Sequence, residues 1–288
     1  MAQGEAGRAF VTYERAFELA DVVEDPARGA EMRCEARWRM ACALKVLGKL
    51  YMTEHELREL LKERDGLRGR GRLRCLLQLG YLYRELSDAY LASVLLGECL
   101  GLARELQDSE TEAGVLNSLG NILHDEGRPG EAIERYRQSL AILERQAGCL
   151  EMQATLRTNL GGALVEAGHF QEGVEELHQA QALARRGGFR RAAALALTRL
   201  GEAWRQRHDA REALRHLAES DALASRPEGS FYDILFLNAY HRWRMAREDD
   251  HKTGERIAFG RLRHLRSMLQ RRFPEVVEFD RQVERMRR

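Results

Sequence analysis

The sequence predicts an all-α protein built as a solenoid of antiparallel helix pairs. Its main evidence is a Leu-Gly dipeptide that recurs at intervals of 40, 41 and 40 residues, as Leu79-Gly80, Leu119-Gly120, Leu160-Gly161 and Leu200-Gly201. A large apolar residue follows each glycine after three positions, a tiny residue after twelve and another bulky residue after sixteen. These spacings place the apolar residues on single faces of two consecutive helices. Neither helix can bury its face alone, so neighbouring pairs must stack.

The copy in residues 116–142 shows how one pair is built. Positions 116, 119, 120 and 123 share one helix face, and positions 132, 136 and 140 share a face of the next helix. The intervening segment 125–130, DEGRPG, ends the first helix and restarts the chain at a proline. Gly120 and Ala132 suit a close helix crossing, because larger side chains there would hold the backbones apart.

At these positions the sequence resembles the tetratricopeptide repeat family, whose first helix carries Leu-Gly and whose second carries a small residue followed by an aromatic one. The resemblance covers about residues 73–226 and implies a right-handed superhelix. Three features depart from the family pattern: a period near 40 instead of about 34, Gly173 in place of an alanine, and Arg157 at an apolar position. The longer repeat is similar to those of kinesin light chains, cell-polarity adaptors and bacterial pheromone receptors and regulators.

We expect three regions along the chain. Residues 1–72 would form degenerate or capping repeats, residues 73–230 four repeats, and residues 231–288 a divergent repeat with basic capping helices. The four repeats would span about 73–112, 113–153, 154–193 and 194–230. The array begins in mid-repeat, which indicates either a natural cap or, as we favour, the cut end of a longer protein.

The N-terminal region is predicted to contain helices over residues 7–24 and 29–51. Thr53-Glu54-His55-Glu56 is predicted to be a capping box that opens the next helix, and Gly66 to end that helix. The glycine- and arginine-rich segment 66–72 fits neither a phosphate loop nor a dinucleotide fingerprint, so we interpret it as a helix cap and solvated linker.

The C-terminal region is predicted to form helices over 233–247, over 251–272 and from Pro274 onward. Residues 241–288 contain 14 Arg and Lys against 8 Asp and Glu, so this end is basic. Its basic surface would comprise Arg261, Arg263, Arg266, Arg271 and Arg272. This surface could meet nucleic acid, an acidic partner or a neighbouring domain. Interleaved carboxylates argue against nucleic acid, because that binding depends on uncompensated positive charge.

Composition excludes several classes of protein. The formal net charge of the 288 residues is +1, and the sequence contains neither an apolar run long enough for a membrane helix nor the apolar core of a signal peptide. We therefore expect a cytoplasmic protein with no membrane contact. The five cysteines lack metal-ligand spacing and are predicted to pack in the core in a reducing compartment, and no cofactor or metal is expected.

Candidate binding residues lie one position past the buried residues of each first helix, on a stripe that lines the concave face in the resembled family. The stripe comprises Tyr81, Arg84, Asn117, Asn121, His124, Asp125, Thr158, Asn159, Glu166, Arg199, Glu202 and Arg205. An asparagine amide both donates and accepts hydrogen bonds, so it can hold the main chain of an extended peptide. The resemblance implies this role for Asn117, Asn121 and Asn159. Alternatively, these residues are solvated side chains on an exposed face.

A search for catalytic residues fails. The sequence contains no nucleophile motif, no HExxH and no paired-carboxylate constellation, and the histidines are expected at the solvated surface. We therefore predict a non-catalytic scaffold that binds a peptide or protein partner on its concave face, in bacterial signalling or regulation. One alternative is the sensor or scaffold segment of a larger regulator, such as a transcription activator, signalling ATPase, kinase or caspase-like protease. Another is nucleic-acid binding through the basic C-terminal helices.

Overall fold

The computed structural model describes residues 2–63, 67–146, 148–226, 229–269 and 273–287. In these ranges the chain forms fourteen α-helices, one short 3-10 helix and one pair of two-residue strands, which confirms the predicted all-α repeat fold. Internal contacts divide it into two units, residues 1–126 and residues 127–288. The division falls inside the expected repeat 113–153, so the repeat boundaries stay a prediction.

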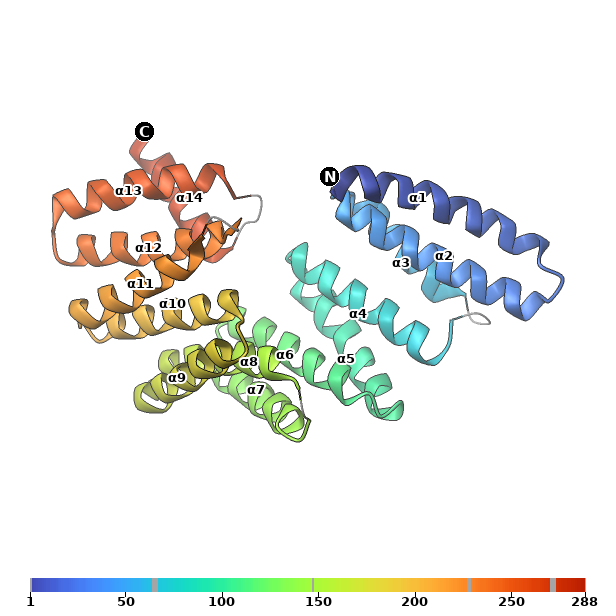
Figure 1. Ribbon diagram of the computed structural model, residues 1–288, viewed down its shortest axis with the longest axis horizontal. Coiled ribbons are helices and arrows are strands. Elements are labelled where there is room, and N and C mark those ends of the chain that lie inside the picture. Colours follow the sequence, from blue (N-terminus) through green and yellow to red (C-terminus); the bar gives the residue numbers. More distant parts are fainter. Residues whose placement is uncertain (1, 64–66, 147, 227–228, 270–272, 288) are drawn as a thin grey trace. The chain divides into compact units, whose positions relative to one another are not determined.

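The first unit consists of consecutive helices that pack against their neighbours in the chain (Figure 1). They are α1 (Ala2–Leu19), the 3-10 helix (Ala20–Val22), α2 (Pro26–Val46), α3 (Leu50–Lys62), α4 (Gly69–Glu85), α5 (Ala89–Glu105) and α6 (Ser109–Asp125). Asp88 and Asp108 cap α5 and α6, because each carboxylate accepts a backbone amide three residues further on.

Two predictions for the N-terminal region are wrong. Helix α2 ends at Val46 rather than continuing to 51, since Gly48 adopts a φ of +73° and turns the chain. Thr53 caps nothing, because it lies inside α3 and its hydroxyl donates to the Lys49 carbonyl oxygen at 3.1 Å. Helix α4 begins at Gly69, so part of the expected linker is helical, and Gly66 lies outside the described residues.

The second unit continues the same helical pattern and adds three C-terminal helices (Figure 1). Its elements are α7 (Pro129–Leu143), α8 (Leu150–Glu166), α9 (Phe170–Arg186), α10 (Arg190–Gln206), α11 (Ala210–Ala224), β1 (Ser225–Arg226), β2 (Gly229–Ser230), α12 (Tyr232–Glu248), α13 (Lys252–Ser267) and α14 (Pro274–Arg287). None of the helices in the described ranges combines the length and apolarity that spanning a membrane requires.

Each Leu-Gly dipeptide lies in the first helix of a predicted pair, on α4, α6, α8 or α10. At three of them, a Cβ added to the glycine would lie 2.7 Å from a leucine of the following helix. These contacts pair Gly80 with Leu96, Gly161 with Leu177, and Gly201 with Leu217. The predicted close crossing is therefore present in these pairs, and it requires a residue without a side chain.

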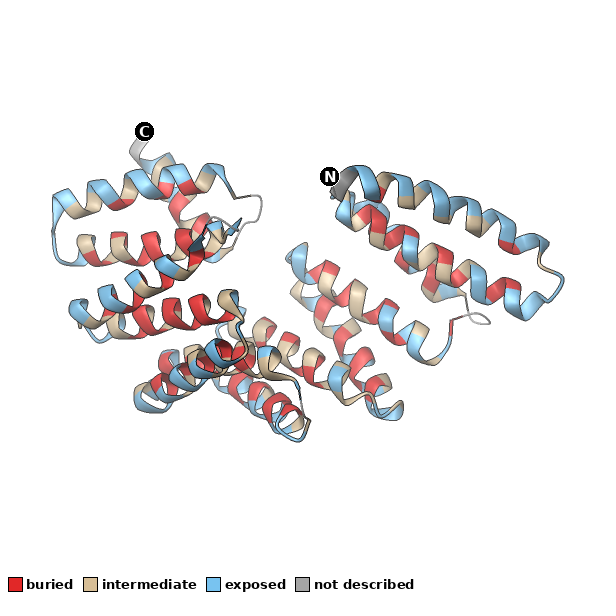
Figure 2. Cartoon of the chain, in the orientation of Figure 1, coloured by how far each residue is buried: buried red, intermediate tan, exposed pale blue. Residues whose placement is uncertain are grey.

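Buried residues lie mainly along the facing sides of the helices, so each unit has a distributed core (Figure 2). The C-terminal helices add an aromatic cluster in which the Phe279 ring lies 5.8 Å from that of Phe236 and 6.4 Å from that of Trp243, centroid to centroid. Of the five cysteines, Cys34, Cys75 and Cys99 are buried and the other two are half-buried. Burial raises the pKa of both the Cys75 and Cys99 thiols to about 12.

A buried hydrogen-bond network joins three helices of the second unit. The Thr198 hydroxyl of α10 donates to the amide oxygen of Asn238 on α12 at 2.7 Å. The amide nitrogen of Asn238 donates to the Ser220 hydroxyl of α11 at 3.0 Å, and Ser220 donates to the Ala194 carbonyl at 2.8 Å. All three side chains are fully buried, so their polar groups depend on one another.

Arg157, which departs from the apolar pattern, is held by two carboxylates. Its guanidinium group contacts Glu144 of the α7 C-cap at 2.5 Å and Glu176 of α9 at 2.6 Å. Only 13% of the Arg157 side chain is exposed. The charge is therefore paired with carboxylates in a largely buried position.

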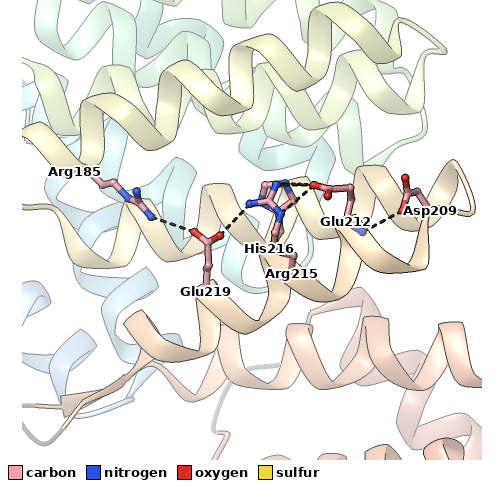
Figure 3. Close-up of polar contacts among 6 residues, drawn as sticks. All are labelled: Arg185, Asp209, Glu212, Arg215, His216 and Glu219. Atoms are coloured by element: carbon pink, nitrogen blue, oxygen red, sulfur yellow. Dashed lines mark hydrogen bonds and ion pairs between the residues drawn. The ribbon is translucent and has the colours of Figure 1, made fainter.

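One face of α11 carries a chain of hydrogen bonds and ion pairs (Figure 3). Asp209 accepts the backbone amide of Glu212, and Arg215 lies between the carboxylates of Glu212 and Glu219. Glu219 also meets Arg185 of α9 at 3.2 Å, which links two neighbouring second helices. Each such exposed ion pair contributes little free energy. These pairs therefore add only slightly to the stability of the contact between α9 and α11.

Two histidines are buried, contrary to the expectation that the histidines lie at the solvated surface. His216 of α11 and His241 of α12 are each 2% exposed. Desolvation lowers the pKa of His216, and the positive charge of Arg215 lowers it further. Both imidazoles belong to the packed interior of the second unit rather than to its surface.

Candidate partner-binding surface

In the first unit, the stripe residues of α4 and α6 come together around Tyr81. A Cβ added to Gly114 of α6 would lie 3.9 Å from the Tyr81 hydroxyl oxygen, so this ring reaches the helix one turn before Asn117. The Arg84 guanidinium lies over the same ring, 5.8 Å from its centroid. Asn117 is partly exposed. A cation and an aromatic ring of α4 thus lie together beside α6, the helix that carries Asn117.

The C-terminal part of the α6 stripe carries Asn121, His124 and Asp125. The first two are partly exposed and Asp125 is exposed. The His124 Nδ1 atom lies 4.0 Å from a carboxylate oxygen of Asp125, which is too far for a hydrogen bond. Across the described ranges, no group of three or more His, Cys, Asp or Glu residues is arranged to hold a metal ion.

In the second unit, the structure corrects one stripe residue of α8. Thr158 is 1% exposed, and its hydroxyl donates to the Ala154 carbonyl oxygen at 2.8 Å. Its side chain therefore does not reach a ligand at the surface. Asn159 is partly exposed and Glu166 is exposed, so these two α8 residues lie at the surface.

The α10 stripe is organised around an ion pair between residues one turn apart. The Arg199 guanidinium meets the Glu202 carboxylate at 2.7 Å, and their side chains are 30% and 17% exposed. The Arg199 side chain also reaches α8 at Gly162, where an added Cβ would lie 3.9 Å from its Cδ and Nε atoms. A glycine on α8 thus leaves room for a charged side chain from α10.

His241 completes this cluster from α12. Its Nε2 atom lies 4.0 Å from a Glu202 carboxylate oxygen. Desolvation would raise the pKa of Glu202, but the positive charges of Arg199, His241 and Arg205 outweigh it and lower that pKa to about 2. Desolvation also lowers the pKa of His241 to about 4, aided by Arg205 and opposed by Glu202. At neutral pH the cluster therefore holds a carboxylate, a guanidinium and a neutral imidazole.

The stripe continues from α10 onto α12 and α14. Arg205 of α10 pairs with Glu248 of α12 at 2.8 Å. Arg244 of α12 lies 3.6 Å from Glu248 and 3.8 Å from Glu278 of α14. The sequence prediction missed His241, Arg244 and Glu248, because α12 lacks a Leu-Gly pair. A signal for α12 is present, since Asn238 follows Thr158 and Thr198 at intervals of 40 residues.

Two arginines of the predicted basic C-terminal surface are paired with carboxylates. Arg266 is held by both carboxylate oxygens of Asp280, the nearer at 3.0 Å. Arg261 lies 3.3 Å from Asp221 with 43% of its side chain exposed, and Arg263 is exposed. The other two predicted members, Arg271 and Arg272, lie outside the described residues.

The comparisons with known proteins agree with this arrangement of helices. Residues 72–145, from α4 to just past the end of α7, match a family model described as the tetratricopeptide repeat. Residues 72–145 therefore belong to the tetratricopeptide repeat family. No curated protein matches the sequence.

Several solved tetratricopeptide-type structures share the fold. The apo form of RapI has a TM-score of 0.70 at 14% identity, over 81% of this chain and 84% of RapI. BtubC from P. vanneervenii has a TM-score of 0.63 at 19% identity, over 76% of this chain and 90% of BtubC. A Rap protein complexed with competence and sporulation factor has a TM-score of 0.59 at 17% identity, over 92% of this chain and 71% of that protein. At these identities the similarity establishes the fold alone.

Proposed function

We propose that the protein is a non-catalytic interaction scaffold that binds an extended peptide or a protein partner through the stripe on its first helices. The observation that carries this proposal is the Arg199–Glu202 ion pair, whose two partly exposed charges hold each other at 2.7 Å and lie beside Gly162 of α8 and His241 of α12. A ligand that meets fixed charges does not have to order them, so less binding free energy is lost.

The polar residues divide the work of recognition in this proposal. The amides of Asn117 and Asn121 in the first unit, and that of Asn159 in the second, each bind main chain of a partner, because an amide matches both the donor and the acceptor of a peptide group. Charged residues of both signs, including Arg199 and Glu202, select the partner's side chains. Such a surface prefers peptides by their charge pattern rather than by net charge.

We place this function in bacterial signalling or regulation. The support is the shared fold with Rap proteins, one of which was solved in complex with competence and sporulation factor. The mixed charges of the stripe and the pairing of Arg266 with Asp280 favour a protein or peptide partner over nucleic acid.

The asparagine stripe is tested by a double variant, Asn117→Ala with Asn121→Ala. Partners captured from the native host are identified by mass spectrometry, and the affinity of the purified partner is measured by calorimetry. Loss of two amides should weaken binding by about 10- to 100-fold, since each hydrogen bond contributes about 0.5–1.5 kcal/mol. Far-UV circular dichroism should show unchanged helicity.

The matched control replaces two exposed amides on second helices, Gln138→Ala with Gln179→Ala. This control loses the same number of amide groups and should bind the partner like the wild-type chain. Wild-type affinity in the Asn117/Asn121 variant, or an equal loss in the control, would remove the assignment of binding to the stripe.

A further inference from the structure

The second unit contains a pocket that no stripe residue lines. It has a volume of about 450 Å³ and lies among α11, α12 and α13. Its apolar wall includes Leu214, Ala239, Met245, Ala246, Ile257 and Ala258. Two of these side chains stay exposed at the rim, Leu214 at 46% and Ile257 at 67%. The volume falls within the range of about 300–1,000 Å³ that is typical of ligand sites.

One end of the pocket carries an excess of positive charge. Arg242 and Arg261 both line it, and both guanidinium groups contact the same oxygen of Asp221, at 2.8 and 3.3 Å. The other oxygen of Asp221 accepts the Asn238 amide at 2.9 Å. One carboxylate therefore serves two guanidinium groups, and Arg261 keeps 43% of its side chain exposed. This end is suited to a second carboxylate.

The opposite end lies at the turn between α12 and α13, where Asp249 and His251 line the pocket. Arg261 lies ten positions after His251, which corresponds to about 15 Å along α13. An extended peptide covers that length with about four or five residues. The pocket is thus an apolar trough with a basic end and an acidic end.

We propose that this trough docks an extended segment of a partner protein that carries a large apolar side chain within about four residues of an Asp or Glu. The apolar side chain fills the space between Leu214 and Ile257, and the carboxylate pairs with Arg261. A protein segment fits better than a free amphiphilic acid, because it also covers the exposed rim outside the pocket. No residue that lines the trough belongs to the stripe, so the protein would bind partners through two different sets of residues.

The test selects peptides from a random displayed library on the full-length chain and measures their affinities by fluorescence polarisation. Enriched peptides should combine a large apolar residue with a nearby Asp or Glu. Their affinity should fall at least tenfold for Leu214→Glu, for Ile257→Glu and for Arg261→Gln. These side chains are exposed or partly exposed, and thermal melts verify that each variant is folded.

The matched control is Arg263→Gln, which removes the same charge from an exposed position on the same helix outside the pocket. It should leave the affinity unchanged. Replacing the peptide's carboxylate by an amide should weaken binding to the wild-type chain but not to Arg261→Gln, since the two groups act as a pair.

Three results would overturn the proposal. The first is failure to recover any peptide, and the second is recovery of peptides that bind the pocket variants as tightly as the wild-type chain. If those peptides instead lose affinity only for the Asn117/Asn121 variant, the stripe function stands and the trough proposal fails. The third is a result in which the pocket variants weaken the binding of dodecanoate but not the binding of the peptides. The pocket would then be a site for a lipid-like acid.

Discussion

Gly161 of α8 and Gly173 of α9 lie backbone against backbone. A Cβ added to either residue would lie 2.7 Å from the carbonyl oxygen of the other. Side-chain atoms also surround both positions, with Leu177 2.7 Å from the first and Val165 2.7 Å from the second. Gly173 replaces the alanine that the repeat pattern favours, and this reciprocal contact supplies the steric reason.

The crossing predicts that Gly161→Ala destabilises the second unit. The new methyl group would meet a backbone oxygen that cannot rotate away, so the two helices must separate. Overpacking of this kind costs about 1–3 kcal/mol. Urea unfolding followed by circular dichroism measures the change. The control is Gly260→Ala in α13, where an added Cβ meets no atom within 4 Å. It should stabilise the helix by up to about 1 kcal/mol, and equal effects of both changes would contradict a steric role for Gly161.

Arg157 provides a second prediction, because its charge is nearly buried between two carboxylates. Arg157→Ala should lower the free energy of unfolding by about 1–3 kcal/mol, less than for a fully buried pair since Glu144 is 48% exposed. Arg137 forms a comparable pair with Glu172 at 2.6 Å, but both side chains are 50% exposed. Arg137→Ala should therefore cost less than about 1 kcal/mol. If Arg137→Ala and Arg157→Ala lowered the free energy of unfolding equally, burial would not determine how much each ion pair contributes.

His241 predicts a loss of stability in mild acid. Its pKa is lowered to about 4 in the folded chain, so between about pH 6.5 and pH 4 the unfolded chain binds the extra proton. The stabilisation is present above pH 6.5 and is lost as the pH falls, by about 2 kcal/mol between pH 7 and pH 5. Glu202, with a pKa of about 2, stays ionised in both folded and unfolded states through most of this window. Urea unfolding at pH 7 and pH 5 measures the change.

The variant His241→Gln isolates the histidine's share of this pH dependence, because glutamine does not titrate. Its loss of stability between pH 7 and pH 5 should be about 2 kcal/mol smaller than that of the wild-type chain. The remaining loss would include His216, whose pKa is also lowered. An identical pH dependence in wild type and variant would show that His241 titrates alike in the folded and unfolded chain.

The repeat pattern predicted the helices that contain Leu-Gly, because close crossings require small residues at fixed positions. The pattern failed where a residue outside the Leu-Gly repeat determines where a helix ends or which helix carries the stripe. Gly48 at φ +73° ends α2, yet a glycine within an apolar pattern does not reveal its backbone angle. Helix α12 was predicted as a helix but not as part of the stripe; it keeps the 40-residue interval through Asn238 but places His241 where the earlier copy has Gly201. A search for the Leu-Gly pair alone therefore does not place α12 in the repeat register.

The candidate surface was predicted less well than the fold. A stripe next to the buried face was expected to be exposed, but first helices pack against neighbours on both sides, which buries Thr158. The neighbours of Glu202 include His241 of α12, which the stripe on first helices did not contain. The α11–α13 pocket was not predicted at all, since its lining joins residues from three helices without a common period.

The network of Thr198, Ser220 and Asn238 bears on how such an array can lengthen during evolution. Repeats joined by apolar contacts alone tolerate duplication or loss of a neighbour, because any apolar helix face of similar shape can bury the exposed one. A duplication inserted between α11 and α12 would instead strand a hydroxyl and an amide in the interior, unless the new copy brought the same polar groups. Growth of the array is therefore expected elsewhere, with this junction inherited as a unit.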